Sequence, residues 1–210
     1  GTGTISVEGV DELHGATHTV ISDRIEAGTF AIAAAMTGGD LTLQRTKART
    51  LDALLMVLRE TGAIVTETDD TIRVVANSRP VAADITTDPF PGFPTDLQAQ
   101  FMAMMCIADG SSRISETIFE NRFMHVPELL RMGADIQVDG GIAMVRGREF
   151  LTPAPVMATD LRASVSLVLA ALTIEGKSQI SRIYHLDRGY SRLEEKLGNC
   201  GAHLRRIKAS

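Results

Sequence analysis

The sequence predicts an α/β domain in which one structural unit occurs three times. Three segments open in the same way, each with an aspartate at the start of an apolar stretch of helical length, and they begin at Ser22, Thr95 and Thr159. Each stretch ends at glycine and is followed by a short segment of alternating apolar and polar residues, which is typical of a strand. Self-similarity of this kind indicates a repeat architecture.

The second half of each unit is predicted to be a helix followed by a hairpin. Four leucines between residues 51 and 58 recur at the spacing of one helix face, and a hairpin pattern follows at 64–68 and 72–76. The second copy repeats the hairpin around a turn at Asp139. Glycine–alanine pairs are expected to end the second helices, and they lie at 62–63, 133–134 and 201–202. Each unit is therefore strand, helix, strand, helix, hairpin, and three units predict a pseudo-threefold domain with helices inside and sheets outside, or the reverse.

These units predict one lobe over residues 1–210. The repeats are expected at about 11–76, 77–147 and 148–210. Residues 5–10 fall in the register of a hairpin's second strand, so we expect 1–10 to be a strand left over from a preceding N-terminal lobe. At the other end, 203–210 is predicted to be a single hairpin strand. Because the first residue is glycine and both ends are out of phase, we expect the chain to be cut from a longer array.

Composition narrows the class of protein. Of 210 residues, 44% are hydrophobic and 22% are charged, as in an ordinary soluble globular protein. A formal net charge of −5 argues against nucleic acid as a partner, since nucleic-acid-binding surfaces usually carry a basic excess. No apolar run approaches the roughly 20 residues that span a bilayer, and no signal peptide is visible. We therefore expect no membrane partner.

The two cysteines indicate neither a metal site nor a redox pair. Cys106 and Cys200 have no ligand or redox spacing. Cys106 lies in an apolar, helix-like run, where a buried and inert thiol is expected. The sequence thus predicts a protein of a reducing compartment without disulfides.

Three aspartates mark the predicted helix starts. Asp23, Asp96 and Asp160 lie where helix caps are expected. If the three helix starts converge, their N–H groups would also form a site for anions. The cap and the anion-site interpretations both stay open at this point.

Arginines recur close to these aspartates. Arg24 and Arg162 are predicted in the first turns of their helices, and Arg122 and Arg188 follow matching strands. A lone arginine is usually a solvated surface residue, whereas guanidinium groups gathered in one place suit carboxylate and phosphate oxygens. The pattern indicates either scattered surface residues or an anion-binding cleft.

Metal and nucleotide motifs are absent from the sequence. His125 and His185 have no partner at metal-ligand spacing. Neither a P-loop nor a dinucleotide-binding glycine motif occurs. We therefore predict no metal and no cofactor.

Five blocks of sequence carry a family resemblance. The blocks are Asp23–Glu26, Phe93–Phe101, Ile118–Leu129, Ala158–Ser164 and Arg182–Tyr190. In order, spacing and length they resemble the UDP-N-acetylglucosamine 1-carboxyvinyltransferase family of enolpyruvyl transferases. The sister family of the shikimate pathway shares the fold, but the blocks around Asn121 and His185 look like the UDP-sugar family.

The resemblance implies an inside-out α/β barrel lobe of the enolpyruvyl transferase type. Such enzymes have two lobes of three repeats each, so the resemblance makes this chain the C-terminal lobe and the missing N-terminal lobe its partner. In the family that other lobe carries a mobile loop with a reactive cysteine, together with a lysine and an arginine that hold phosphoenolpyruvate. Cys106 and Cys200 do not match that loop.

The resemblance also implies a reaction. A cytoplasmic enzyme transfers the enolpyruvyl group of phosphoenolpyruvate to the 3-hydroxyl of UDP-N-acetylglucosamine and releases phosphate, in the first committed step of peptidoglycan synthesis. Asp96 matches the catalytic aspartate, which takes the hydroxyl proton and bonds the sugar. Because the cysteine loop lies outside this chain, a second class stays open: a non-catalytic UDP-sugar-binding or scaffold module when the lobe is isolated.

Further positions match the family's substrate-binding residues. Arg122, Arg162 and Arg188 match residues on the phosphoenolpyruvate side. Ile118 matches a position that contacts the sugar nucleotide through its backbone. Two weaker candidates complete the expected site, namely Arg24 and Asp160, the latter by orienting Arg162.

Overall fold

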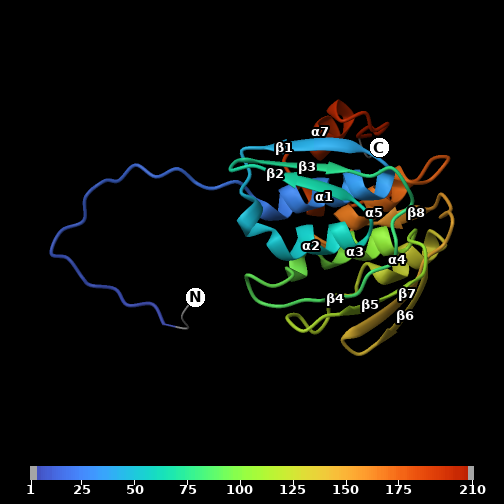
Figure 1. Cartoon of the computed structure of the whole chain (residues 1–210), viewed down its shortest axis with the longest axis horizontal. Coiled ribbons are helices and arrows are strands. Elements are labelled where there is room, and N and C mark those ends of the chain that lie inside the picture. The colour runs from blue at the N-terminus through green and yellow to red at the C-terminus, as the bar shows by residue number, and fades with distance from the viewer. Residues whose placement is uncertain (1–3, 208–210) are drawn as a thin grey trace.

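Three buried helices form the centre of the molecule, and sheets cover them (Figure 1). The computed structural model describes residues 4–207. The central helices are α1 (Arg24–Thr37), α3 (Gln98–Met105) and α5 (Val165–Leu172), and each contacts the other two. All eight residues of α3 are buried. Of the two arrangements that the sequence left open, the structure has the one with the helices inside.

Local sequence explains where these helices begin and end. Asp23 caps α1, since its Oδ1 accepts hydrogen bonds from the N–H groups of Ile25 at 2.8 Å and Glu26 at 3.3 Å. The helix ends at Gly38, whose φ of 68° is left-handed and favours glycine. Helix α3 is buried around its whole circumference and is apolar except for Gln98 and Gln100, which is typical of a helix enclosed by other elements.

Three sheets lie around the helices. The first has the order β1-β3-β2 and is antiparallel, and the second has the order β4-β5-β7-β6 with β4 and β5 parallel. The third is the parallel pair β8 and β9. The strands are β1 (Asp40–Gln44), β2 (Ile64–Glu67), β3 (Thr71–Val75), β4 (Ile85–Thr86), β5 (Ser111–Ser115), β6 (Asp135–Asp139), β7 (Ile142–Arg146), β8 (Pro155–Met157) and β9 (Gln179–Ser181). Alternate residues of β3 and β7 are buried against the helices, as the period of a strand requires.

The remaining helices of the described residues complete the fold. They are η1 (Ala48–Thr50), α2 (Asp52–Glu60), η2 (Thr95–Leu97), α4 (Val126–Arg131), α6 (Tyr184–Asp187) and α7 (Leu193–Asn199). Helix α2 confirms the helix predicted from the leucines at 51–58. The pairs β2–β3 and β6–β7 confirm the two predicted hairpins.

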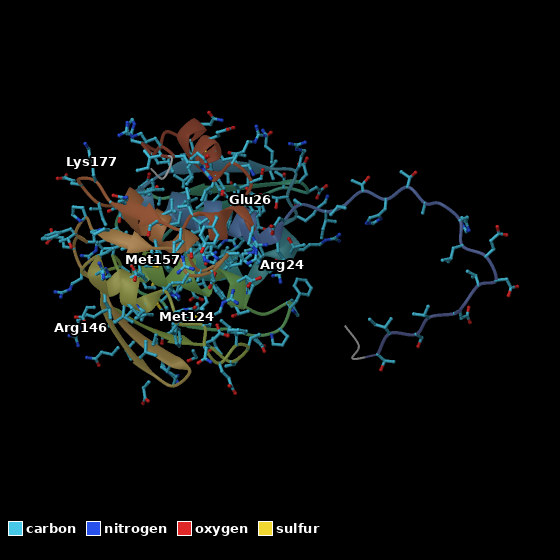
Figure 2. All side chains as sticks on the ribbon, turned by 180° about the vertical axis from the view of Figure 1, so that it is seen from behind. Arg24, Glu26, Met124, Arg146, Met157 and Lys177 are labelled. Atoms are coloured by element: carbon cyan, nitrogen blue, oxygen red, sulfur yellow. The ribbon has the colours of Figure 1, made fainter. Side chains whose placement is uncertain are left out.

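Both ends of the chain differ from the prediction. Residues 4–22 form neither helix nor strand and extend away from the body in both views (Figures 1 and 2). The strand predicted at 5–10 therefore does not form, because a strand needs a neighbour for its N–H and C=O groups. Of the strand predicted at 203–210, residues 203–207 are not a strand. Residues 1–3 and 208–210 lie outside the described residues.

Within residues 4–207, none of the helices has both the length and the apolar character that crossing a bilayer requires.

Candidate active site

The leading ends of α3 and α5 border a pocket of about 410 Å³. Its lining comes from η2, from residues 119–124 and from the turn ahead of α5. The lining residues are Asp96, Phe119, Asn121, Arg122, Met124, Asp160, Leu161 and Arg162. The structure therefore brings four of the seven predicted site residues to one pocket: Asp96, Arg122, Asp160 and Arg162.

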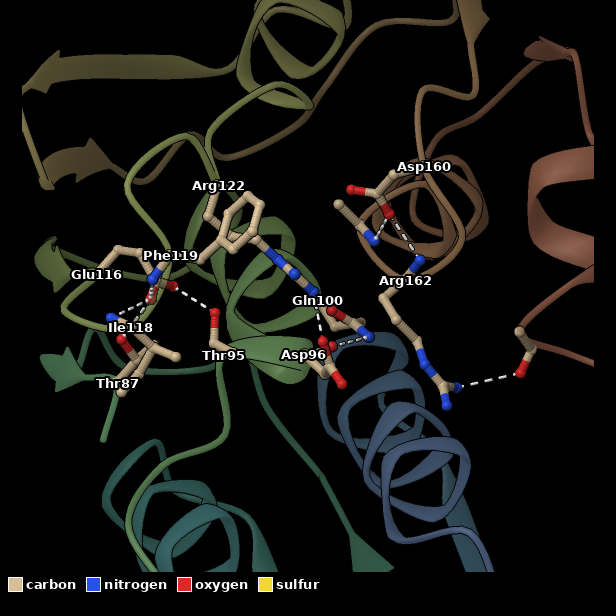
Figure 3. Close-up of polar contacts among 12 residues, drawn as sticks. Thr87, Thr95, Asp96, Gln100, Glu116, Ile118, Phe119, Arg122, Asp160 and Arg162 are labelled. Carbon is tan, nitrogen blue, oxygen red and sulfur yellow. Dashed lines mark hydrogen bonds and ion pairs between the residues drawn. The ribbon is translucent and has the colours of Figure 1, made fainter. Parts of the chain in front are cut away.

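Asp96 has a carboxylate that faces the pocket and is only partly engaged. Its Oδ1 accepts a hydrogen bond from Nη2 of Arg122 at 2.5 Å (Figure 3). Within residues 4–207, no hydrogen bond involves its Oδ2, and the side chain is 40% exposed. The Arg122 side chain is only 16% exposed and lies over the Phe119 ring, 5.5 Å from its centroid. A ligand can thus reach one oxygen of Asp96 while the other holds the guanidinium group.

The other two aspartates bond backbone N–H groups, but only one of them caps a helix. Asp23 bonds the first N–H groups of α1, whereas Oδ1 of Asp160 accepts from the N–H groups of Arg162 and Ala163, both at 2.6 Å, within the turn ahead of α5. The cap interpretation is therefore right for Asp23 and wrong for Asp96 and Asp160, since the N-cap residue of α5 is Ser164. Because α5 begins only at Val165, Arg162 lies in the turn ahead of the helix and not in its first turn, as the sequence had predicted.

Arg162 is held in place by Asp23. Its Nη2 donates to Oδ2 of Asp23 at 3.2 Å, its Nη1 donates to the carbonyl of Gly189 at 3.1 Å, and the group lies over the Tyr190 ring. Burial works against the charged form, but Asp23 and Tyr190 together outweigh it, so the pKa of Arg162 lies above its usual value. Asp160 was expected to orient this guanidinium group, but it bonds the backbone N–H of Arg162 and not its side chain.

A buried polar network supports the pocket from below. Nε2 of Gln100 donates to the backbone carbonyl of Asp96 at 2.9 Å and to the hydroxyl groups of Thr29 and Tyr190, each at 3.2 Å. The Thr29 and Tyr190 hydroxyl groups are 2.9 Å apart. All three side chains are buried, and burial raises the pKa of Tyr190, so its hydroxyl stays protonated at neutral pH. This network connects α1, α3 and the turn at Tyr190 directly beneath Asp96.

Glu116 is a residue that the sequence analysis missed. Its buried carboxylate accepts hydrogen bonds from Thr87, Thr95 and the N–H groups of Ile118 and Phe119 (Figure 3). A signal was available, because Glu116 lies two residues after the buried Ile114 and so continues the inward face of β5. A carboxylate on a buried face needs hydrogen-bond partners.

Three predicted site residues lie outside the pocket lining. The guanidinium group of Arg24 lies over the exposed Phe90 ring, 5.3 Å from its centroid. Arg188 is exposed, and its side chain makes no ion pair or hydrogen bond with residues 4–207. Ile118 is partly exposed, and its N–H group is bonded to Glu116.

His125 lies next to this site but is enclosed. Burial lowers its pKa to about 4, and the nearby charge of Asp160 only partly opposes this effect. The ring is therefore neutral at physiological pH. In the described part of the chain, no three His, Cys, Asp or Glu side chains gather as metal ligands would.

Comparison with known proteins identifies related sequences. The family model described as EPSP synthase (3-phosphoshikimate 1-carboxyvinyltransferase) matches residues 1–197. The chain is 61% identical over 209 residues to the UDP-N-acetylglucosamine 1-carboxyvinyltransferase of Caulobacter sp. (strain K31). It is 63% identical over 209 residues to the protein of the same name from Caulobacter vibrioides (strain NA1000 / CB15N). These alignments cover 99% of the chain but 48% and 49% of the relatives, so the chain spans about half their length.

Solved structures have the same architecture. The enolpyruvyl transferase NikO from Streptomyces tendae superposes with a TM-score of 0.78 at 28% identity, over 90% of this chain and 45% of that one. EPSP synthase from Acinetobacter baumannii superposes with a TM-score of 0.70 at 19% identity, over 86% of this chain and 46% of that one. The second likeness concerns the fold alone.

Proposed function

The chain belongs to the EPSP synthase family of enolpyruvyl transferases, and we propose that it is the catalytic lobe of a UDP-N-acetylglucosamine 1-carboxyvinyltransferase. The complete enzyme transfers the enolpyruvyl group of phosphoenolpyruvate to the 3-hydroxyl of UDP-N-acetylglucosamine and releases phosphate. Curated relatives more than 60% identical carry this name. The observation that carries the proposal is the pocket in which the accessible Oδ2 of Asp96 lies among lining residues that include Arg122 and Arg162.

In this reaction Asp96 is the general base. Its Oδ2 takes the proton of the sugar 3-hydroxyl while the hydroxyl oxygen bonds to the phosphate-bearing carbon of phosphoenolpyruvate, and an acidic group of the N-terminal lobe gives a proton to the methylene carbon. In the tetrahedral adduct the C–O bond to phosphate then breaks and the new methyl group returns its proton to that group, which restores the double bond. The proton that Asp96 took leaves with the phosphate. Asp96 lines the pocket and is not consumed by capping, which supports this role.

The arginines supply fixed positive charge for an anionic substrate. Arg122 is fixed by Asp96, and Arg162 by Asp23 and Gly189, so neither needs to reorganise when phosphoenolpyruvate binds. The exposed Arg188 and, more weakly, Arg24 complete the set once the N-terminal lobe closes and excludes water.

In this proposal the sugar nucleotide also contacts Ile118. The N–H of Ile118 is occupied by Glu116, which supports a contact through its carbonyl oxygen. Asp160 contributes to the site indirectly, because it holds the turn that carries Arg162.

The lobe is built from three pseudo-threefold repeats at about 11–76, 77–147 and 148–210, with 1–10 belonging to the connection toward the N-terminal lobe. The element order supports this division, since α1-β1-α2-β2-β3 is followed by β4-α3-β5-α4-β6-β7 and then by β8-α5-β9 and two short helices. We place the enzyme in the cytoplasm, where both substrates are made.

Phosphate release by the complete protein tests the function. Phosphate should appear when UDP-N-acetylglucosamine and phosphoenolpyruvate are both present, and should not appear when shikimate 3-phosphate replaces the sugar nucleotide. If phosphate appeared with phosphoenolpyruvate and shikimate 3-phosphate but not with the sugar nucleotide, the protein would catalyse the sister reaction. Binding of UDP-N-acetylglucosamine without any phosphate release would instead support the non-catalytic binding module.

A further inference from the structure

We propose that Glu116 is a positioning residue of this enzyme, which holds Asp96 and the segment from Ile118 to Arg122 in their active arrangement. The inference rests on the proposed function for its catalytic consequence. Glu116 does not line the pocket. It acts through the two segments of chain that do.

The contacts of Glu116 reach both segments. Its Oε2 accepts from the hydroxyl of Thr95, the residue before Asp96, at 2.8 Å. Its Oε1 accepts from the N–H groups of Ile118 at 2.9 Å and Phe119 at 3.1 Å, and from the hydroxyl of Thr87 at 2.8 Å. Figure 3 shows the carboxylate between the two segments, with Asp96 and Arg122 meeting further along.

The neighbours of Glu116 are all hydrogen-bond donors. A carboxylate is an acceptor only, and all four of its neighbours are hydroxyl or N–H groups that can donate. Hydrogen bonds to a charged acceptor are roughly twice as strong as neutral ones. The cluster therefore replaces the regular backbone pairing that residues 117–125 lack between β5 and α4.

The hydrogen bonds of Glu116, which act as a clamp between the two segments, determine where Asp96 and Arg122 form their ion pair. The bond between Asp96 and Arg122 joins the same two segments as Glu116 does. If Glu116 releases them, Asp96 and Arg122 shift relative to each other and to the bound substrates. A misplacement of about 1 Å costs on the order of 100-fold in rate.

Two substitutions of Glu116 test whether the enzyme needs its hydrogen bonds or its negative charge. In Glu116→Gln the remaining oxygen can still accept from Thr87, Ile118 and Phe119, and the amide can donate to the Thr95 hydroxyl after it rotates. We expect kcat within about 5-fold of the wild type. Glu116→Leu keeps the size but accepts nothing, so kcat should fall about 100-fold and KM for UDP-N-acetylglucosamine should rise.

A control variant tests whether the loss of any backbone-bonded carboxylate lowers turnover. Oε2 of Glu128 accepts a hydrogen bond from the N–H of Met157 at 2.9 Å and ties α4 to β8 outside the pocket lining. Glu128→Leu removes one hydrogen bond where Glu116→Leu removes four, so it should lower the unfolding temperature less, and it should leave kcat within about 2-fold. If Glu116→Leu does not fold, Thr95→Val removes only the arm toward Asp96 and should lower kcat about 10-fold.

Hydrogen exchange of the complete protein gives a readout that does not depend on turnover. The amide hydrogens of Ile118 and Phe119 should exchange faster in Glu116→Leu than in the wild type, and at the wild-type rate in Glu128→Leu. Near-normal turnover in Glu116→Leu, or an equal loss in Glu128→Leu, would overturn the inference. If the wild type itself releases no phosphate, the proposed function fails, and unaltered exchange in Glu116→Leu would then reject the clamp separately.

Discussion

The hydroxyl of Tyr190 belongs to the buried network beneath Asp96, and removing it should destabilise the protein measurably. Tyr190→Phe deletes one oxygen that contacts Thr29 at 2.9 Å and Gln100 at 3.2 Å. Neither neighbour loses its last partner, because Thr29 still donates to the carbonyl of Ile25 and Gln100 still donates to that of Asp96. The cost is therefore that of two hydrogen bonds without an additional orphaned group.

Two net hydrogen bonds correspond to about 2 kcal/mol. In a domain of about 200 residues each kcal/mol lowers the unfolding midpoint by about 2–4 °C, so we expect a decrease of about 4–8 °C. In a double-mutant cycle with Thr29→Val, the coupling between the two hydroxyl groups should be about 1 kcal/mol. Turnover should also fall, because the same network fixes the Asp96 backbone.

Scanning calorimetry of the complete protein measures this effect, and Tyr184→Phe is the matched control. Tyr184 is exposed, and its hydroxyl accepts a surface hydrogen bond from Arg182 at 3.0 Å. Its loss should change stability by no more than about 0.5 kcal/mol. Equal midpoints for Tyr190→Phe and Tyr184→Phe, or a coupling energy of zero, would refute the reasoning.

Three other predictions concern two buried side chains and one glycine that lies close to a neighbouring carbonyl group. Burial lowers the pKa of His125 from 6.5 to about 4. Between these pH values the unfolded chain therefore binds a proton that the folded chain does not. The free energy of unfolding should fall by about 3 kcal/mol as the pH decreases through this window. A pH series of unfolding midpoints should lose this slope in His125→Phe, and an unchanged slope would contradict the assignment. Burial raises the pKa of the Cys106 thiol to about 12. Iodoacetamide at pH 7.5 should therefore label the exposed Cys200 and leave Cys106 unlabelled until the protein unfolds. Equal labelling of the two cysteines, measured by mass spectrometry, would disprove this prediction. A Cβ at Gly147 would lie 1.8 Å from the carbonyl oxygen of Ala108. In denaturant unfolding, Gly147→Ala should therefore lower the free energy of unfolding by more than about 2 kcal/mol. An unchanged free energy would contradict this prediction, because it would show that the backbone here moves aside at little cost.

Local features of the sequence predicted the elements well. Helix α2 and the hairpins follow from residue periodicity and turn residues, which act within a few positions of the chain. The strand at 5–10 has the right alternation but no neighbour to pair with in the structure, and alternation alone does not reveal this. The central position of α3 was left open, since an apolar run shows that a helix is buried but not what covers it.

The candidate site was predictable only in part, because its contacts join residues that are far apart in the sequence. Asp96 and Arg122 could be proposed from repeat position and family resemblance, but their ion pair depends on how η2 packs against the turn that carries Arg122. Asp23 holds Arg162 across 139 residues of sequence, so no local pattern could assign it that role. Arg188 resembles Arg122 in sequence context, yet the first is exposed and the second is enclosed by the pocket.

The most direct test of the account is the turnover of Asp96→Asn in the complete protein, measured as phosphate release from phosphoenolpyruvate in the presence of UDP-N-acetylglucosamine. The amide can still accept a hydrogen bond from Arg122 but cannot take the hydroxyl proton, so kcat should fall at least about 100-fold while the unfolding midpoint stays within a few degrees. Phosphate release close to the wild-type rate would contradict the account, because the proton acceptor would then lie elsewhere.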